Sequence, residues 1–375
     1  MKGIKIFTPG QNFILPFIKD WLSNLDFIPH HRSPQFRSIL RELKTKLLWL
    51  LGTKDSKIAF FNSSGSGAIE AIALSLNKKP LVINSGKFGQ RWLEIFNRFK
   101  IPFLELRSKL GETVPLEKIE ECLKKNKEIE YVIVTHCETS TGVFYDLESL
   151  GNLTYNLDRF LIVDAISTVG SIKFEMDRWR VDSVIGSSHK GIGAIAGLSF
   201  VSISEKLLEN LYKGRKKPSF YHNLIDEIEF QNIKEETRFT PTVLLMMILD
   251  KVIERIKYLG MEAIEKHVNR ISEIVKFSCL SLGLTQLPSS PSPTISVFKL
   301  PHQLKATEFV DSLAKKFNIY IGKGQGELKE KVIRITHYWY HELNDILALV
   351  FSLEEELNFR GIKKRIDYEK IGGLL

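Results

Sequence analysis

Between residues 57 and 203 the chain alternates short apolar runs with segments of helical periodicity. The runs are apolar throughout, which is typical of strands buried on both faces of a mostly parallel sheet. The first run leads into a turn of Gly and Ser residues and a helical segment over Ala68–Leu76. This order predicts an α/β fold. The predicted strands are Lys57–Phe61, Leu81–Ile83, Tyr131–Val134, Phe160–Val163, Ser183–Gly186 and Leu198–Val201.

Beyond residue 243 the predicted elements become longer and more amphipathic. Val243–Leu259 reads as one helix that ends at Gly260, and a second helix covers 261–281. A proline-rich loop then leads into further alternating elements. We therefore predict a large domain over 1–257 and a smaller α+β domain over 258–375. The elements expected in the small domain are strands at Thr294–Leu300, Ile319–Ile321 and Lys331–Thr336 and helices at 304–317 and 341–357.

The composition narrows the class of protein. Among 375 residues, 43% are hydrophobic and 26% charged, which excludes disordered and fibrous classes. Three cysteines without C-x-x-C spacing cannot form a disulfide framework, so we expect a reducing, cytoplasmic compartment and no cysteine-based metal site. Neither a signal peptide nor an apolar run of about 18 residues is visible, so we expect no membrane partner.

The net charge of +9 raises the question of a nucleic-acid partner. The basic residues are scattered, with small clusters at Lys213–Lys217 and Lys363–Arg365. Neither an aromatic-interleaved basic stripe nor a zinc motif accompanies them. Such clusters are usually solvated surface, so we expect no nucleic-acid partner.

Lys190 is the strongest candidate for chemistry. It lies in a turn of small residues just after the strand Ser183–Gly186. The carboxyl edge of an open α/β sheet is where such folds bind ligands, and a lysine there can form a Schiff base if its pKa is lowered. The alternative interpretation is a solvated loop lysine.

Two further features make a cofactor site more probable. Asp164 ends the strand Phe160–Val163, and a carboxylate at a buried strand end needs a cationic partner, such as the protonated pyridine nitrogen of pyridoxal phosphate (PLP). A helix N-cap is the alternative role for Asp164. Ser64–Ala68 joins a strand to a helix and can hold an anion, although it lacks the P-loop and dinucleotide-binding spacings. A lysine, an acid and an anion cradle together are what PLP requires.

At this point the chain resembles a class V aminotransferase of PLP fold type I, in the branch of alanine–glyoxylate and serine–pyruvate aminotransferases. The resemblance implies a large domain with a mostly parallel seven-stranded sheet, a small α+β C-terminal domain, PLP as cofactor, and a homodimer with active sites at the subunit interface. The matching segments, in chain order, are Thr8–Gly10, His31–Ser33, Ser64–Ala68, Gly86–Trp92, His136–Gly142, Val163–Ser167, Ser188–Lys190, Lys217–Tyr221, Phe239–Pro241, Gly324–Lys329 and Ile333–Ile335.

The resemblance also implies roles for individual residues. Lys190 is similar to the Schiff-base lysine that moves the substrate proton, and Asp164 to the partner of the pyridine nitrogen. Arg334 resembles the arginine that binds the substrate carboxylate, with Gly10 and Thr139 beside it. The remaining positions implied to bind the cofactor are Ser66, Gly67, Ala68, Phe88, Thr139, Ile166, His189 and, from the neighbouring subunit, Thr240.

Three departures from the family pattern bear on the substrate. His189 replaces the usual Gln or Asn, and its charge is expected to respond to pH near neutrality. Gly191–Gly197 lacks a Pro-Pro-Gly segment, and Thr237 stands where some relatives have a tyrosine. We predict a transaminase that moves an amino group from a small amino acid, such as alanine or serine, to glyoxylate or pyruvate. The sequence leaves the amino donor open.

Two alternatives keep the same cofactor. One is a 2-aminoethylphosphonate–pyruvate type of transaminase, and the other is a PLP-dependent lyase or cysteine desulfurase. A desulfurase needs a cysteine on a mobile loop, whereas Cys122, Cys137 and Cys279 all lie in or beside predicted elements. In addition, Phe88 occupies the position of the histidine that stacks on the cofactor in desulfurases.

Overall fold

The computed structural model describes residues 3–10, 13–214 and 219–374. Part of the segment Lys217–Tyr221 and of the cluster Lys213–Lys217 therefore lies outside the described residues, namely positions 215–218.

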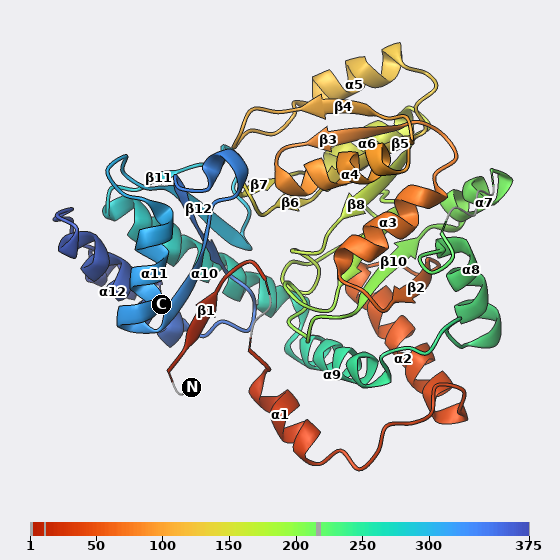
Figure 1. The fold of residues 1–375 in the computed structure, drawn as a ribbon, viewed down its shortest axis with the longest axis horizontal. Coiled ribbons are helices and arrows are strands. Elements are labelled where there is room, and N and C mark those ends of the chain that lie inside the picture. Colours follow the sequence, from red (N-terminus) through yellow and green to blue (C-terminus); the bar gives the residue numbers. More distant parts are fainter. Residues whose placement is uncertain (1–2, 11–12, 215–218, 375) are drawn as a thin grey trace.

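A seven-stranded sheet forms the centre of the larger part of the molecule (Figure 1). Its strands pair in parallel except at the strand over 199–203, which runs antiparallel to both of its neighbours. This confirms the predicted α/β fold with a mostly parallel seven-stranded sheet. In spatial order the strands are β2 (Lys57–Phe61), β10 (Ser199–Ile203), β9 (Ser183–Ser187), β8 (Phe160–Asp164), β5 (Tyr131–Thr135), β3 (Pro80–Asn84) and β4 (Leu104–Arg107).

Helices cover both faces of this sheet, which explains the continuous apolar runs. In β5, Val132 and Val134 pack into one core, and Ile133 packs into the core on the opposite face. The first face is covered by α2 (Pro34–Leu51), α5 (Leu116–Lys125), α6 (Leu147–Asn156) and α9 (Val243–Leu259). The second is covered by α3 (Gly65–Ser75), α4 (Lys87–Arg98), α7 (Glu205–Lys213) and α8 (Leu224–Glu229).

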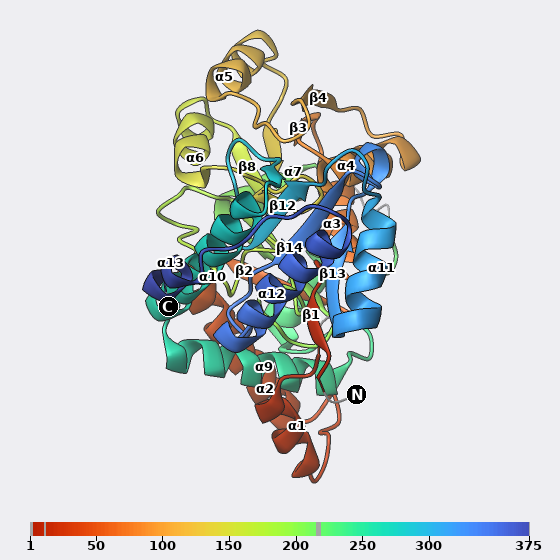
Figure 2. The same cartoon turned by 90° about the vertical axis from the view of Figure 1, so that its left-hand side faces the viewer.

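A five-stranded sheet organises the C-terminal part (Figure 2). Its spatial order is β1 (Lys5–Phe7), β13 (Ile319–Lys323), β14 (Val332–Thr336), β12 (Ile295–Lys299) and β11 (Thr285–Gln286). The helices packed on it are α10 (Met261–Ser281), α11 (Ala306–Phe317), α12 (Leu343–Phe359) and α13 (Tyr368–Leu374). The predicted helices and strands of this region agree with the observed ones to within two residues.

The N-terminal strand β1 belongs to this second sheet, although it is the first strand of the chain. It pairs in parallel with β13, and Figure 1 shows it among the C-terminal elements. The chain then leaves through Pro9 and Gly10 toward α1 (Pro16–Ser23). The boundary between residues 257 and 258 remains a prediction.

Shorter elements complete the described chain. They are the hairpin strands β6 (Cys137–Glu138) and β7 (Val143–Phe144), the π-helical turn η1 (Phe230–Lys234) and the 3-10 turn η2 (Gly326–Leu328). Within the described residues, the helices are all too short or too polar to cross a lipid bilayer.

Candidate active site

A cavity of about 280 Å³ opens at the carboxyl ends of β5, β8 and β9, the edge where open α/β sheets bind ligands. Seven of the predicted site residues line it, namely Gly10, Ser66, Phe88, Asp164, Ile166, His189 and Lys190. The other lining residues are Pro9, Ser64, Gly65, Arg91, Thr135, Cys137 and Ser167. Five predicted residues do not line this cavity: Gly67, Ala68, Thr139, Thr240 and Arg334.

Lys190 follows β9 in a tight turn. Its backbone is left-handed, with φ of 62°, a conformation that costs a lysine about 1 kcal/mol or more. The phenol of Tyr340 donates to the Lys190 carbonyl at 3.0 Å and helps to hold this turn. The amine donates to the Ser167 hydroxyl at 3.3 Å. Because the side chain is only 8% exposed, burial lowers the pKa of the amine, and the nearby Asp164 opposes that effect.

Asp164 is the last residue of β8 and is 4% exposed. One carboxylate oxygen accepts the Ile166 backbone N–H at 3.1 Å. Burial nevertheless raises the pKa of Asp164 to about 6. Among the residues that the structure describes, no cationic side chain forms a salt bridge with Asp164. This acid is therefore prepared for a cationic ligand that would favour its charged form.

Phe88 lies in the first turn of α4, and Glu138 fixes that turn. A single Glu138 oxygen, Oε2, accepts the backbone N–H groups of Phe88 and Gly89, both at 2.9 Å. The carboxylate thus caps a helix N-terminus, where negative charge is favourable. The Lys190 amine lies 4.7 Å from the centroid of the Phe88 ring. This places an aromatic face beside the amine.

The anion cradle predicted at Ser64–Ala68 forms the start of α3, with Ser64 as the N-cap residue. The first turn of a helix presents backbone N–H groups without intrahelical partners. A Cβ at Gly65 would lie 2.2 Å from Cδ1 of Ile166, so a larger residue there would displace the Ile166 side chain, which lines the cavity. Ser66 faces the cavity, whereas Gly67 and Ala68 are buried within the helix.

His189 lies beside this cradle, with Nδ1 3.0 Å from the Ser187 hydroxyl. Burial, helped by the charge of Lys190, lowers the pKa of His189 to about 4. The expectation that its charge changes near neutral pH was therefore wrong. Burial removes the water that would stabilise the charged ring, so His189 is a neutral hydrogen-bonding group at pH 7.

Arg334 lies on β14, 6% exposed, and is held by two carbonyl groups. Its Nε donates to Lys323 at 2.7 Å, and Nη1 donates to Thr139 at 3.1 Å. Burial lowers the pKa of Arg334 to about 10, so the guanidinium keeps its charge at neutral pH. Its strand neighbour Gly322 packs against Pro9, which lines the cavity. Arg334 therefore lies near the Pro9 side of the cavity.

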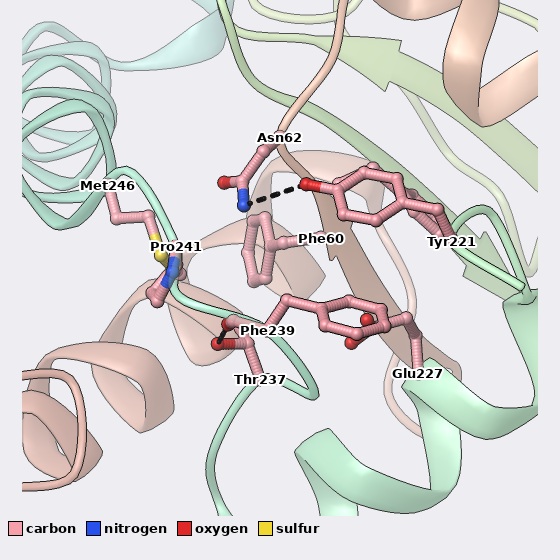
Figure 3. A pocket seen from close by; sticks show the side chains of 9 residues that line it. Phe60, Asn62, Tyr221, Glu227, Thr237, Phe239, Pro241 and Met246 are labelled. Atoms are coloured by element: carbon pink, nitrogen blue, oxygen red, sulfur yellow. Dashed lines mark hydrogen bonds between the residues drawn. The ribbon is translucent and has the colours of Figure 1, made fainter.

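The loop that contains Thr237 and Thr240 contributes no residue to the cavity around Lys190. Its Thr237, Phe239 and Pro241 instead line a separate pocket, which Figure 3 shows. The Thr237 hydroxyl is buried and donates to the Phe239 carbonyl at 2.6 Å, so it serves the loop itself. Thr240 is exposed, and its carbonyl accepts the Asn62 amide at 3.0 Å. Figure 3 shows Asn62 in turn facing the hydroxyl of Tyr221, 3.5 Å away.

Comparison with known proteins identifies the family. The sequence profile described as "Aminotransferase class-V" matches residues 13–349. The chain belongs to the class V aminotransferases. It is 33% identical over 334 residues to the soluble hydrogenase 42 kDa subunit of Anabaena cylindrica, which covers 86% of each chain. It is 30% identical over 329 residues to the L-aspartate–glyoxylate aminotransferase of Paracoccus denitrificans, which covers 85% of this chain and 82% of the relative.

The fold agrees with this assignment. The crystal structure of the pyridoxamine–pyruvate aminotransferase from Mesorhizobium loti superimposes with a TM-score of 0.91 at 21% identity, covering all of this chain and 96% of the other. The predicted fold type I architecture is thereby confirmed. Class V aminotransferases are PLP enzymes, so the family implies this cofactor.

Two buried threonine hydroxyl groups of this region are available to a polar ligand. Thr135 Oγ1 and Thr139 Oγ1 are buried and lack hydrogen-bond partners among the described residues. Eight other buried polar atoms of the described residues also lack a partner, so it is the position of Thr135, on the cavity wall, that makes its hydroxyl a candidate ligand contact. Thr135 lines the cavity, in register with Asp164 on the adjacent strand. With an amine, an acid, an aromatic face and a helix N-terminus around one cavity, the residues fit PLP.

Three residues of this site, Arg91, Thr135 and Glu138, are not among the predicted ones. Arg91 and Glu138 fall inside matched segments, Gly86–Trp92 and His136–Gly142, and that is the signal that could have found them. Thr135 directly follows the predicted strand Tyr131–Val134. Among the described residues, the side chains of His, Cys, Asp and Glu form no group of three that could hold a metal ion.

Proposed function

We propose that this class V aminotransferase moves an amino group from a small amino acid to a small 2-oxo acid such as glyoxylate or pyruvate, with PLP bound at Lys190. The observation that carries the proposal is the meeting of the Lys190 amine, the Asp164 carboxylate and the Phe88 ring in one cavity. Relatives named serine–glyoxylate and L-aspartate–glyoxylate aminotransferase support this choice of acceptor.

PLP, when bound, supplies an electron sink that stabilises negative charge at the substrate Cα. The Lys190 amine would hold its aldehyde carbon, and Asp164 would pair with its ring nitrogen. Phe88 and Ile166 would pack against the ring. The phosphate would lie at the α3 N-terminus beside Ser66 and His189. The orphan hydroxyl of Thr139 would find its partner in the ring's oxygen or the substrate.

Lys190 has the properties needed to move a proton. Burial lowers the pKa of its amine, so the neutral form that accepts a proton becomes more accessible at physiological pH. Ser167 orients the amine, and Tyr340 holds the backbone from which it projects. The amine can therefore take the α-proton and return it at a fixed position.

Arg334 would bind the substrate carboxylate. The carbonyl groups of Lys323 and Thr139 fix the plane of its guanidinium, so little side-chain entropy is lost when a carboxylate binds. Nη2 remains available for that carboxylate. A planar guanidinium suits a carboxylate better than an ammonium group does.

We also propose a homodimer in which Thr240 reaches the phosphate of the partner subunit. Thr240 is exposed on its own chain and lies outside that chain's cavity. Phe220, which is 78% exposed, lies with its ring centroid 5.5 Å from that of Phe239, the residue before Thr240, so an aromatic surface beside Thr240 is open to a partner. Sedimentation should show a dimer. The Thr240→Ala variant should bind PLP more weakly but should still sediment as a dimer. A monomer at micromolar concentration would contradict this proposal.

The function is tested with purified holoenzyme and a panel of donors. Alanine, serine, glycine, aspartate, 2-aminoethylphosphonate and cysteine are each offered with glyoxylate or pyruvate, and 2-oxo acid and sulfide are measured. We expect 2-oxo acid from at least one donor. Lys190→Ala should abolish turnover, whereas Lys206→Ala, which changes an exposed lysine paired with Asp158, should not. Normal turnover by Lys190→Ala would refute the assignment of the catalytic lysine.

The same panel separates the alternatives. Sulfide release from cysteine without transamination would indicate a desulfurase. Cys137 lines the cavity, but burial raises the pKa of its thiol to about 11, which leaves little thiolate for that chemistry. Turnover of 2-aminoethylphosphonate alone would indicate the phosphonate branch.

A further inference from the structure

Arg91 brings a guanidinium group into the active-site cavity for which the proposed function has no role. It lies on α4, three residues after Phe88 and therefore on the same face of the helix. Its Cζ lies 4.9 Å from the centroid of the Phe88 ring. The side chain is half-buried, and within the described chain it forms neither a hydrogen bond nor an ion pair.

Neighbouring cations are paired, which sets Arg91 apart. Lys87, at the start of the same helix, bonds to Glu94 at 2.9 Å. Arg107, near the same end of the sheet, bonds to Glu105 at 2.6 Å and to Gln90 at 2.7 Å. A cation without an anion inside a cavity is favourable when the ligand brings the anion.

The other charges in and around the cavity already have partners under the proposed function. Asp164 is assigned to the cofactor ring, the α3 N-terminus to the phosphate, and Arg334 to the α-carboxylate. Glu138 is occupied by the N-terminus of α4. Arg91 is the positive charge that has no assigned partner. It acts on the titratable cavity groups through space: burial raises the pKa of Asp164 and lowers that of Lys190, and the charge of Arg91 contributes a smaller lowering of both.

We propose that Arg91 binds a second acidic group of the substrate, the distal carboxylate of a short dicarboxylic amino acid or 2-oxo acid. Packing on the Phe88 ring holds the guanidinium plane, and the Lys190 amine approaches the same ring. A substrate that reacts beside Lys190 can therefore reach Arg91 with a short acidic side chain. The inference rests on the proposed function and deepens it by naming the substrate class.

The test compares aspartate with asparagine, its uncharged counterpart of nearly equal shape, and with alanine. Holoenzyme is assayed with glyoxylate as acceptor, and kcat and KM are measured separately. The wild type should have a KM for aspartate at least tenfold below that for asparagine. Arg91→Gln should raise the aspartate KM about tenfold, the effect of losing one hydrogen bond to a charged group, and leave the alanine KM within about twofold. The aspartate KM of Arg91→Lys should lie between those of the wild type and Arg91→Gln.

Arg98→Gln is the matched control, because Arg98 is exposed at the other end of α4. The KM values for aspartate, asparagine and alanine should be the same in this variant as in the wild type. PLP affinity, measured by absorbance titration of the apoprotein, should be the same in Arg91→Gln and the wild type. A weaker PLP affinity in that variant would make Arg91 a cofactor ligand and overturn the proposal.

The kinetic outcomes separate this inference from the proposed function. An active wild type whose aspartate-to-asparagine KM ratio is unaffected by Arg91→Gln overturns the inference and leaves transamination standing. A wild type that transaminates no donor overturns both.

Discussion

Glu138 offers the sharpest test of how this site is built, because one carboxylate holds two segments together. Its Oε2 accepts the N–H groups of Phe88 and Gly89, and its Oε1 accepts the Ser140 N–H at 3.1 Å and the Ser140 hydroxyl at 2.5 Å. The side chain is 1% exposed. Glu138→Ala removes all four bonds at once and leaves buried donors without acceptors.

The cost follows from which donors stay buried. Water from the cavity can reach the half-buried Phe88, whereas Gly89 and Ser140 are buried. Each buried donor that loses its acceptor costs about 1–3 kcal/mol, so we expect Glu138→Ala to lose about 4 kcal/mol of unfolding free energy. Glu138→Gln keeps the shape but turns one acceptor into a donor, so about 2 kcal/mol should be lost.

The assay is urea unfolding of the apoprotein, followed by far-UV circular dichroism and by tryptophan fluorescence. Trp92 on α4 is fully buried and reports on that helix. Ser140→Ala is the internal control. It removes a bond to Glu138 and a bond from the Lys87 N–H, and should cost about 1 kcal/mol. A loss in Glu138→Ala no larger than that in Ser140→Ala would refute the capping role.

Three further predictions concern single side chains. Thr139→Val removes a buried hydroxyl that has no hydrogen-bond partner among the described residues, so the apoprotein should keep its unfolding free energy or gain up to about 1 kcal/mol. The rise in Tm on adding PLP should become smaller. A destabilised apoprotein would contradict this prediction. Cys137→Ser should keep at least about half the turnover, since the pKa of the thiol, raised to about 11 by burial, leaves it protonated. Burial raises the pKa of Asp182 to about 6, above the value of about 4 expected in the unfolded chain, so the folded state binds this proton more tightly. The free energy of unfolding gained from this proton is fully present below about pH 4 and is lost as the pH rises through about 6. Asp182→Asn should flatten that loss in urea titrations of the apoprotein.

In the large sheet, the strands that the sequence predicted are those buried on both faces. β5 and β8 are uniformly apolar because helices cover each side, and such runs are readable without knowing the partners. β4 escaped prediction because it is an edge strand whose four residues, Leu104–Arg107, alternate in polarity. β1 escaped because three residues carry too little pattern, and its partner β13 lies more than three hundred residues away.

The site residues divide in the same way. Lys190 and Asp164 stand out in the sequence because each follows an apolar run, and the fold brings both to one sheet edge. Arg91 and Glu138 acquire their roles only from neighbours distant in sequence. Nothing in the local pattern shows that Glu138 caps α4 or that Arg91 lacks a counter-ion. The charge of His189 was misjudged for a related reason, because burial depends on the complete fold.

The two sheets of the molecule contribute different residues to the candidate site. The large sheet provides the amine and the acid, at the ends of β9 and β8. The C-terminal part provides Arg334, and three donors bind it to loops of the large sheet: Arg334 to the Thr139 carbonyl, Tyr340 to the Lys190 carbonyl, and Trp339 to the Ile192 carbonyl at 3.0 Å. The Lys190 and Ile192 carbonyls belong to the turn after β9, so direct hydrogen bonds fix the position of the C-terminal part, which carries Arg334, relative to Lys190. Under the proposed function, these bonds hold the substrate-binding arginine and the reacting lysine at a constant spacing.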